Sequence, residues 1–436
     1  MNREARISVK QILLIAFAGL FFRLALVSLK SPGFRDGWGG EMASVASSLA
    51  QGQGFSSPFW VATGPTAWVS PVYPYVLSVI FRVFGVHAPA SREFAHYLNA
   101  VISALTGIPI ALIGRKVFGQ LVGLTAGWLW ALCPLTGYSE CLYIWNTSLY
   151  ALLLAVVFLV GIQMHEGQSS MSWCGFGLLM GFTALTEAAC LPFLVVLIAW
   201  QYFRQRANRK TVCLTLLGLS ALIGLSLLRN SVAFGQPVFL RSNFGLELFR
   251  GLHEDDFASA ADLHITPSRD VAERDAYLKQ GEIPYMQQKL HEALEFIADH
   301  PLQVAARSLR RWVAFWVGSA HVASLFWFSG RFYILKHVIF VLPALLAFYG
   351  LYSMIRYRIE GLFLFSFLLL AYPLPYCFTP TWPRYRSPIE PEMIVISSFV
   401  LVEHWRRRNT APGATTPSSR WRLDNPWGRA QPAKMS

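Results

Sequence analysis

Two pairs of charged residues, near opposite ends of the chain, carry the chemistry that the sequence suggests. Asp36 and Glu41 lie in the first polar stretch, which follows an apolar segment at 11–29. Arg384 and Arg386 lie in a proline-rich stretch near the end. A carboxylate can take a proton from an attacking hydroxyl group, and guanidinium groups bind phosphate through paired hydrogen bonds. Together these side chains suggest a transfer reaction in which a phosphate is the leaving group.

A short helix is predicted to begin at Glu41. The apolar residues after it recur at helical spacing, and they are Met42, Val45, Ala46 and Leu49. Gly52 and Gly54 follow, where glycine ends a helix at little cost. A carboxylate suits the positive end of the helix dipole, so Glu41 is the preferred base and Asp36 the alternative. The plainer interpretation is that both acids are solvated residues of a turn and a helix start.

The composition is that of a membrane protein. Of the 436 residues, 54% are apolar and only 14% are charged, whereas about a quarter of the residues are charged in a typical soluble protein. The net charge of +13 comes mainly from basic residues beside apolar runs and in the tail. That placement orients membrane helices, so we expect a lipid bilayer as partner and no nucleic acid. The six cysteines lie in or beside apolar runs without paired spacing, which argues against a disulfide framework or a metal site.

The apolar runs predict an all-α polytopic membrane protein with about ten transmembrane helices. They are expected at 11–29, 93–114, 119–136, 147–164, 173–186, 190–203, 211–228, 332–352, 361–378 and 389–402. Basic clusters begin four of the five loops that this count places in the cytoplasm, as the positive-inside rule requires. Arg23, in the first run, is expected to reach the membrane surface, with a place in a site as the alternative. Residues 72–86 and 312–328 are predicted to be interfacial, although a crossing stays open for both.

The predicted domain organisation is simple. Residues 1–408 form one transmembrane domain, in which 30–92 make a first outer loop with interfacial helices. A second outer-face loop at 229–330 contains an amphipathic helix over 276–298 and the interfacial segment. Residues 409–436 are expected to be a disordered cytoplasmic tail. This organisation predicts a multi-pass protein of the cytoplasmic (inner) membrane with its site on the periplasmic or extracellular face.

The same topology places further polar residues on the outer face. As candidate substrate-site residues we take Glu140, Asn146, Glu187, Tyr73, Asn230 and Tyr385. Glu140 is either an interfacial residue or a second acid, and Glu187 and Asn230 also fit simple turn and loop roles. The adjacent acidic and histidine residues at 253–256 cannot all face one ion, which favours a solvated loop and no metal site. No cofactor is predicted, although the carboxylates of the first loop could hold a divalent cation transiently.

Six stretches resemble, in their order along the chain, a known family of membrane enzymes. They are the acidic first loop with ASSLAQGQGF, then PVYPYVLSVIFRVFG, YLNAVISALTGIPIALIGRKVFG, LTEAACLPFL, RNSVAFGQPVFLRSNFGLEL and RYRSPIEP. Together they extend over most of residues 8–405. The chain thereby resembles the C superfamily of membrane glycosyltransferases, near the family 39-like group of protein mannosyltransferases and lipid A aminoarabinose transferases.

The resemblance implies transfer of a sugar from a polyprenyl-phosphate carrier at the outer face, with inversion of the anomeric centre. Glu41 or Asp36 would deprotonate a lipid, glycan or protein acceptor, and the two arginines of RYRSPIEP would bind the donor phosphate. The chain departs from the family twice. Trp38 occupies the register of an acidic pair in the first loop, and Asn146 replaces a second acid. The alternatives are a non-enzymatic transporter or binding protein for lipid-linked glycans, and a ligase that uses a pyrophosphate-linked donor.

Overall fold

The computed structural model describes residues 7–29, 38–165, 167–204, 207–253, 265–318, 333–359 and 361–409. Asp36, the acidic run at 254–256 and the predicted disordered tail beyond residue 409 lie outside these ranges. The described chain is all-α, as predicted, and its one β pairing is an isolated bridge between Ser56 and Pro65.

Four helical segments of the described chain are long and apolar enough to cross a membrane. They are α1 (Val9–Ser28), α4 with α5 (Pro89–Leu105 and Gly107–Phe118), α11 (Arg209–Phe234) and α17 (Tyr333–Tyr357). Shorter or less apolar helices complete the bundle, namely α6 (Gln120–Leu132), α8 (Thr147–Gln163), α9 (Ser170–Thr186), α10 (Leu191–Arg204), α18 (Leu362–Leu370) and α20 (Glu390–Arg408). Each of the ten predicted runs therefore contains a helix, while the count of ten crossings stays a prediction.

Small residues let neighbouring helices of the bundle approach closely. A Cβ atom at Gly177 of α9 would lie 2.1 Å from the carbonyl oxygen of Thr215 in α11. A Cβ atom at Gly218 of α11 would lie 2.3 Å from the carbonyl oxygen of Cys174. Small residues at such contacts are typical of membrane helices, which gain little from apolar burial in lipid and depend on close packing instead.

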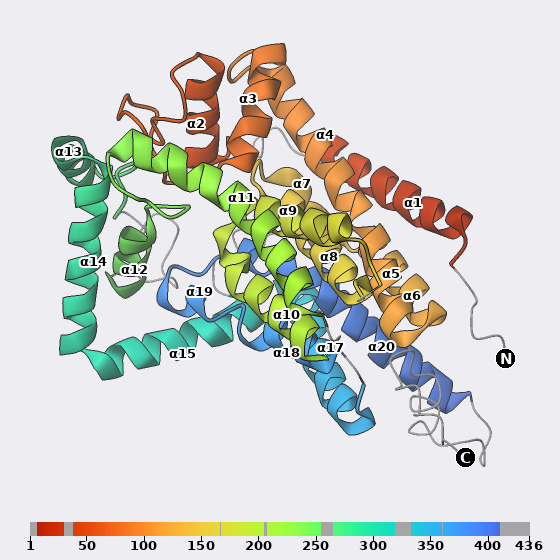
Figure 1. Cartoon of the computed structure of the whole chain (residues 1–436). Helices are drawn as coiled ribbons and strands as arrows, with labels where there is room; N and C mark the ends of the chain where they lie inside the picture. Colours follow the sequence, from red (N-terminus) through yellow and green to blue (C-terminus); the bar gives the residue numbers. More distant parts are fainter. Residues whose placement is uncertain are drawn as a thin grey trace.

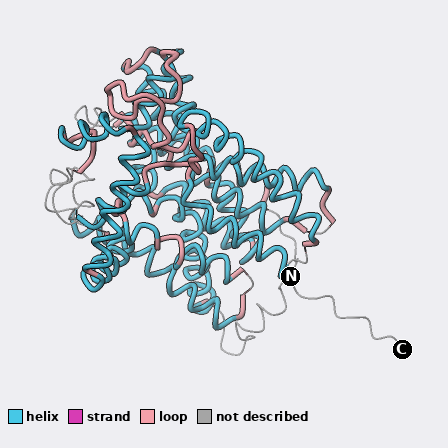
Figure 2. The backbone as a smooth tube through the Cα atoms, turned by 60° about the vertical axis from the view of Figure 1, so that its left-hand side comes forward, coloured by secondary structure: helices cyan, strands magenta, loops and turns pink. Residues whose placement is uncertain are grey.

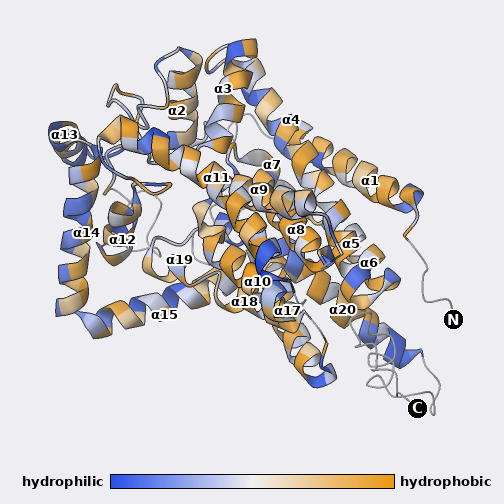
Figure 3. Cartoon of the chain, in the orientation of Figure 1, coloured by the Kyte–Doolittle hydropathy of each residue, from blue (hydrophilic) through white to orange (hydrophobic). Residues whose placement is uncertain are grey.

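The core of the bundle forms around α20, whose first half is almost entirely buried. Aromatic rings join it to its neighbours: Phe118 of α5 stacks on Phe399 of α20, with ring centroids 4.6 Å apart. Phe365 of α18 likewise packs on Phe158 of α8, with centroids 4.8 Å apart. Figure 3 shows the predominantly hydrophobic colouring of these bundle helices.

The remaining helices gather at one end of the bundle, which we name the loop end. They are α2 (Gly40–Ala50), α3 (Val72–Phe84), α12 (Phe244–His253), α13 (Val271–Gln280) and α14 (Glu282–Asp299). Figure 1 shows them opposite the start of α1 and the last turn of α20, and Figure 2 shows most loop segments at the same end. From there α15 (Pro301–Val317) leads back to the bundle, where it contacts α17 and the short helix α19 (Pro375–Phe378).

Three local predictions differ from the structure. The amphipathic run at 276–298 is two helices, because Gly281, with φ of +82°, ends α13 and begins α14. The predicted span at 361–378 is interrupted after Leu370 by a turn that contains Pro373. Arg23 does not reach the membrane surface; it is buried and donates to Ser103 Oγ at 2.8 Å and to backbone carbonyl groups.

Glu282, at the first turn of α14, fastens the first polar loop to the later one. Its carboxylate accepts hydrogen bonds from Thr66 Oγ1 at 2.6 Å and from the Ala67 amide at 2.7 Å. It also accepts from Ser242 Oγ and from the Tyr277 hydroxyl. Burial, followed by the nearby carboxylate, raises the pKa of Tyr277, so this phenol stays a hydrogen-bond donor. Residues that are far apart in sequence are thus held in one rigid unit.

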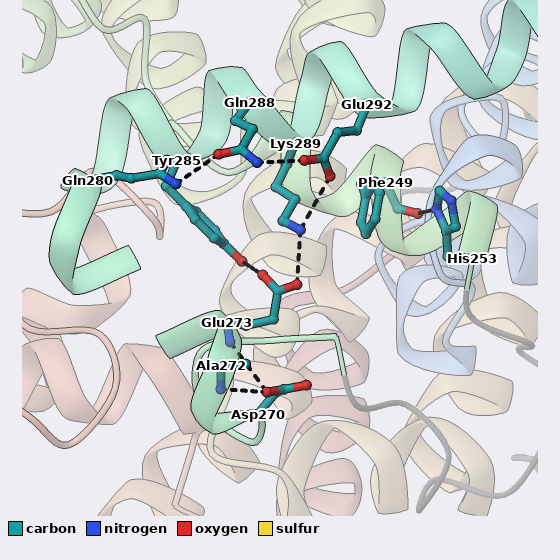
Figure 4. Close-up of polar contacts among 10 residues, drawn as sticks. All are labelled: Phe249, His253, Asp270, Ala272, Glu273, Gln280, Tyr285, Gln288, Lys289 and Glu292. Carbon is teal, nitrogen blue, oxygen red and sulfur yellow. Dashed lines mark hydrogen bonds and ion pairs between the residues drawn. The ribbon is translucent and has the colours of Figure 1, made fainter. Parts of the chain in front are cut away.

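A second polar network holds α12, α13 and α14 together (Figure 4). Lys289 of α14 is buried and donates to Glu273 of α13 at 2.9 Å, and its Nζ lies 4.3 Å from the ring centroid of Phe249 in α12. The Tyr285 hydroxyl donates to the same Glu273 carboxylate. Asp270 caps α13 by accepting from two backbone amides of its first turn. These contacts fix α12, and with it the segment at 241–243 that precedes it, against α13 and α14.

Candidate functional site

Trp145 lies where two distant parts of the chain meet. Gly40, at the start of α2, has φ of +48°, and a Cβ atom there would lie 3.4 Å from the Trp145 ring. Glu41 is the next residue. The guanidinium carbon of Arg384 lies over the same ring, 4.2 Å from its centroid. The structure therefore places Arg384 and the start of α2, where Glu41 follows Gly40, against the same tryptophan ring.

Glu41 occupies the first turn of α2 and is half-buried. Its carboxylate accepts no hydrogen bond from any residue that the structure describes. Two backbone features fix its position: the close contact of Gly40 with Trp145, and Gly39, where a Cβ atom would lie 2.0 Å from the carbonyl oxygen of Ile144. A carboxylate that no described residue uses as an acceptor can receive the hydrogen of an acceptor hydroxyl group.

Arg384 is held by aromatic faces and by no carboxylate of the described ranges. Its guanidinium carbon lies 5.6 Å from the ring centroid of Trp382 and 5.4 Å from that of Tyr385, besides the contact with Trp145. Its Nε atom is buried without a hydrogen-bond partner in the described chain. Cation–π contacts hold a guanidinium in place without neutralising it. The arrangement suits an anion such as a phosphate, which would accept the unused hydrogen bonds.

Arg386 lies in the opposite environment. It is buried, and its Nε and Nη2 atoms donate to Glu390 Oε1 at 3.1 and 2.9 Å. Its Nη1 atom donates to the carbonyl oxygens of Trp316 and Phe340, so the guanidinium ties α20 to α15 and α17. The predicted phosphate-binding role of Arg386 does not fit this environment, because its donor groups are already directed at protein acceptors.

Asn146 and Glu187 belong to a polar chain directly beside Trp145. Asn146 Nδ2 donates to Glu187 Oε2 at 3.2 Å, and Glu187 Oε1 pairs with Arg241 Nη1 at 3.0 Å. The other end of Arg241, Nε, donates to the carbonyl oxygen of Trp68. Burial favours a lower pKa for Arg241, but the carboxylates of Glu187 and Glu247 outweigh it and raise the pKa. Arg241 therefore stays protonated in its ion pair with Glu187. The hydrogen bond from Asn146 to Glu187 fixes the loop that carries Trp145.

Tyr385 completes the aromatic surroundings of Arg384. Its ring stacks on Tyr376, with centroids 4.6 Å apart and planes at 19°. Burial raises the pKa of Tyr385, although the charge of Arg384 opposes the rise. The same two causes act on Tyr143, whose pKa burial raises to about 12. Both phenols therefore stay protonated at neutral pH and able to donate hydrogen bonds.

Three other predicted site residues have structural partners elsewhere. The hydroxyl of Tyr73 is buried and donates to Asn99 Oδ1 at 3.0 Å. Asn230 donates to backbone carbonyl groups of the loop after α11. Glu140, on α7 (Pro134–Leu142), is buried and accepts from Ser103, while its Oε1 atom has no partner in the described chain. None of these contacts connects the three residues to Trp145.

Arg241 was missed by sequence reasoning. It lies within the stretch RNSVAFGQPVFLRSNFGLEL, but nothing in its spacing links it to Glu187. Trp145 was missed for the same reason, since one tryptophan among 15 carries no signal by itself. As for metals, the described residues contain no group of three or more histidine, cysteine or acidic side chains that could hold an ion. Part of the 253–256 run lies outside them, so the expected lack of a metal site stays a prediction.

Comparison of the sequence with protein-family models and with curated proteins finds no match. The fold, in contrast, matches solved structures. The oligosaccharyltransferase of Archaeoglobus fulgidus in its apo form matches with a TM-score of 0.54 and 15% identity, over 97% of this chain and 55% of that one. The same organism's AglB, in complex with an inhibitory peptide and a dolichol-phosphate, matches with a TM-score of 0.51 and 17% identity, over 94% and 53%.

ArnT from Cupriavidus metallidurans bound to undecaprenyl phosphate has a TM-score of 0.49 and 15% identity, over 95% of this chain and 68% of that one. The chain thus spans about half the length of the archaeal oligosaccharyltransferase, 55% in the apo form. At these identities the likeness to the two oligosaccharyltransferase structures, with TM-scores above 0.5, shows a shared fold. It confirms, at the level of the fold, the resemblance to membrane glycosyltransferases that the order of motifs predicted.

Proposed function

We propose that this protein transfers a sugar from a polyprenyl-phosphate-linked donor to an acceptor at the outer face of the cytoplasmic membrane. The observation that carries the proposal is that the Trp145 ring contacts both Arg384 and Gly40, the residue directly before Glu41. Such a transfer needs a carboxylate to take a proton and a guanidinium to bind a phosphate, and among the described residues Glu41 accepts no hydrogen bond and Arg384 pairs with no carboxylate. The shared fold supports the proposal, because the solved AglB complex contains a dolichol-phosphate.

In the proposed reaction, the oxygen of an acceptor hydroxyl group attacks the anomeric carbon of the sugar. Glu41 accepts the hydroxyl proton as the new C–O bond forms. The bond between the anomeric carbon and the phosphate oxygen breaks, and the phosphate leaves with the bonding electron pair. Arg384 stabilises the negative charge that builds on that oxygen. Attack opposite to the leaving group inverts the anomeric centre. Asp36 is the alternative base.

Two neighbouring groups would orient the substrates. The Tyr385 hydroxyl lies beside Arg384 and stays protonated, so it can donate to a phosphate or sugar oxygen. Asn146 and Glu187 fix the loop that carries Trp145. Arg386 is left out of the mechanism, since Glu390 already holds it. The acceptor is a lipid, a glycan or a protein, and the fold likeness to an oligosaccharyltransferase keeps a glycan ligase with a pyrophosphate-linked donor as the second candidate.

A deletion strain tests the proposal. Mass spectrometry of its surface glycolipids, glycans and glycoproteins should reveal one missing sugar, which the wild-type gene restores. Glu41→Gln and Arg384→Ala should each fail to restore it although both proteins insert into the membrane. Asp299→Asn, a change at the exposed end of α14 that keeps the size of the side chain, serves as the control and should restore it. Restoration by both site variants would remove the site assignment, and loss of a complete oligosaccharide would favour the ligase.

A further inference from the structure

A groove with a volume of about 540 Å³ lies between the loop at 51–66 and the last turns of α11. Its lining combines apolar residues such as Pro65 and Val232 with the polar residues Gln53, Ser56 and Ser57. Neither Glu41 nor Arg384 lines it. The groove is thus a separate concavity at the loop end of the molecule, and the proposed transfer reaction does not use it.

Arg229 places a positive charge in this groove. Its Nη1 atom donates to the carbonyl oxygen of Thr66 and its Nη2 atom to that of Phe55, both at 2.6 Å. Phe55 and Thr66 are the neighbours of Ser56 and Pro65, the two residues paired in the β bridge. Arg229 therefore binds both segments of the loop, one through each carbonyl group. Asn230 accepts a third hydrogen bond from Nη1. A guanidinium group has five N–H donors, so two remain for a ligand.

No carboxylate of the described chain forms an ion pair with Arg229. Glu282 acts on it electrostatically, but that carboxylate accepts four hydrogen bonds from other residues. The lining residues include no acid. The groove is therefore positive, with hydroxyl and amide groups beside the charge, and it suits an anionic head with hydrogen-bonding oxygens.

An exposed apolar stripe leads from the membrane to the groove. On α11, Leu225, Leu228 and Val232 are 64%, 62% and 78% exposed, at a spacing of three and four residues that puts them on one face. This helix is long and apolar enough to span a membrane, and its C-terminal end reaches the loop end (Figure 1). Val232 belongs both to the stripe and to the groove wall, so the two surfaces are continuous.

We propose that the groove binds the headgroup of an anionic lipid from the leaflet at the loop end, with an acyl chain along the stripe on α11. The apolar stripe buries the chain, and the unused donors of Arg229, with Ser56 and Ser57, bind the phosphate. A soluble anion would find the same charge but no stripe. A lipid is favoured over a soluble anion because the groove and the apolar stripe on α11 form one continuous surface at Val232.

Native mass spectrometry of the detergent-purified protein, titrated with phosphatidylglycerol or with phosphatidylcholine of the same acyl chains, tests this site. We expect phosphatidylglycerol to bind about tenfold more tightly, because its net negative charge is not offset by a choline cation and its glycerol hydroxyl groups can hydrogen-bond in the groove. Val232→Glu, which adds a negative charge to the groove wall, should abolish the preference. Ala62→Trp, which fills the groove without touching Arg229, should weaken the binding of phosphatidylglycerol.

Phe239→Glu is the matched control, because it adds the same charge at a position that is 57% exposed and does not line the groove. It should keep the preference. Equal binding of the two lipids by the wild-type protein would overturn the proposal, as would an unchanged preference in both groove variants. Full displacement of phosphatidylglycerol by an equal concentration of inorganic phosphate would also overturn it, since that result would mean an anion site without a lipid. These outcomes are independent of glycosyl transfer.

Discussion

Arg384 and Arg386 are two residues apart, yet their surroundings favour different roles: ligand binding for Arg384 and structural stabilisation for Arg386. The guanidinium of Arg384 touches aromatic rings and has a buried Nε atom without a partner in the described chain. That of Arg386 is paired with Glu390 and two carbonyl groups. A charge on an aromatic cage is available to a ligand, whereas a charge in a buried ion pair stabilises the fold.

This contrast predicts opposite phenotypes for two alanine variants. Arg386→Ala leaves Glu390 buried without its partner, which should cost about 3–5 kcal/mol of stability and lower the thermal unfolding temperature. Arg384→Ala should unfold at the wild-type temperature and lose the binding of a polyprenyl phosphate. Differential scanning fluorimetry and a lipid-phosphate binding assay on both proteins measure the two effects. A large loss of stability in Arg384→Ala alone would contradict the contrast.

Glu41→Gln separates the base from the binding machinery. The amide keeps the size of the side chain but cannot accept the proton, so turnover should fall about 100- to 10,000-fold. Donor affinity should not change, because Arg384 and its aromatic cage are intact. Single-turnover assays and donor binding on the same preparation provide the two readouts. A parallel loss of both would mean that Glu41 has a structural role at the start of α2.

At the residue scale, the site could be predicted only where a residue type breaks a local rule. Glu41 stands out as an acid at a helix start after an apolar run, and Arg384 as a cation in a loop placed outside. Arg241 carries no such mark, because its partner Glu187 comes from a different part of the chain. The error on Arg386 has the same origin: its i, i+4 partner Glu390 was visible in the sequence, but the burial that makes the pair structural was not.

At the scale of elements, the packing of α9 on α11 gives a test with a built-in control. Gly177→Ala would put a methyl group 2.1 Å from the carbonyl oxygen of Thr215, and such overpacking costs about 1–3 kcal/mol. Gly175→Ala, on the same helix, meets nothing within 4 Å and removes a helix-destabilising glycine. Unfolding temperatures should fall for the first variant and stay or rise for the second. Equal unfolding temperatures for the two variants would show that α9 and α11 can move apart to accommodate the methyl group at little cost.

Glu282 gives a second test at this scale, because its hydrogen bonds join α14 to the first polar loop and to α13. Glu282→Gln replaces one carboxylate oxygen with a donor group that faces donors such as the Thr66 and Tyr277 hydroxyls. Leaving buried donors unsatisfied should cost about 1–3 kcal/mol. Faster proteolysis within the 51–66 loop should accompany the loss, whereas the exposed change Gln288→Glu should leave the cleavage rate unaltered. Unchanged protection of that loop would contradict the fastening role.

Helix existence was predictable because apolar periodicity and length act locally: α2 covers Gly40–Ala50, close to the predicted start at Glu41 and the predicted stop at Gly52. Helix breaks were harder. Gly281 divides a run whose apolar pattern continues across it, so the pattern alone could not reveal the turn between α13 and α14. Arg23 was misplaced because a single span says nothing about Ser103, which comes from a different helix and binds it. What the sequence could not supply were contacts between elements.

At the scale of the whole molecule, the contact of Trp145 with both Gly40 and Arg384 has a topological consequence. A residue pair that shares one ring cannot lie on opposite sides of a membrane, so the segments that carry them must emerge on the same side. The basic residues that close α5, and those in the last turn of α20, mark the other side. The ten predicted spans are consistent with this constraint, and with them the positive-inside rule predicts that the shared side is the outer one.

Labelling of single cysteines tests this sidedness. The six native cysteines form no disulfide bond among the residues described, so they can be replaced by alanine. A cysteine at the exposed position Gln51 or Leu302 should react in intact cells with a membrane-impermeant maleimide. A cysteine at His165 or Arg408 should react only after permeabilisation, because the predicted span count places both inside and the basic cluster at the end of α20 agrees for Arg408. Labelling of Gln51→Cys only after permeabilisation would contradict this topology. Glu41 and Arg384 would then have no access to a substrate presented at the outer surface, and the transferase mechanism would have to operate in the cytoplasm or not at all.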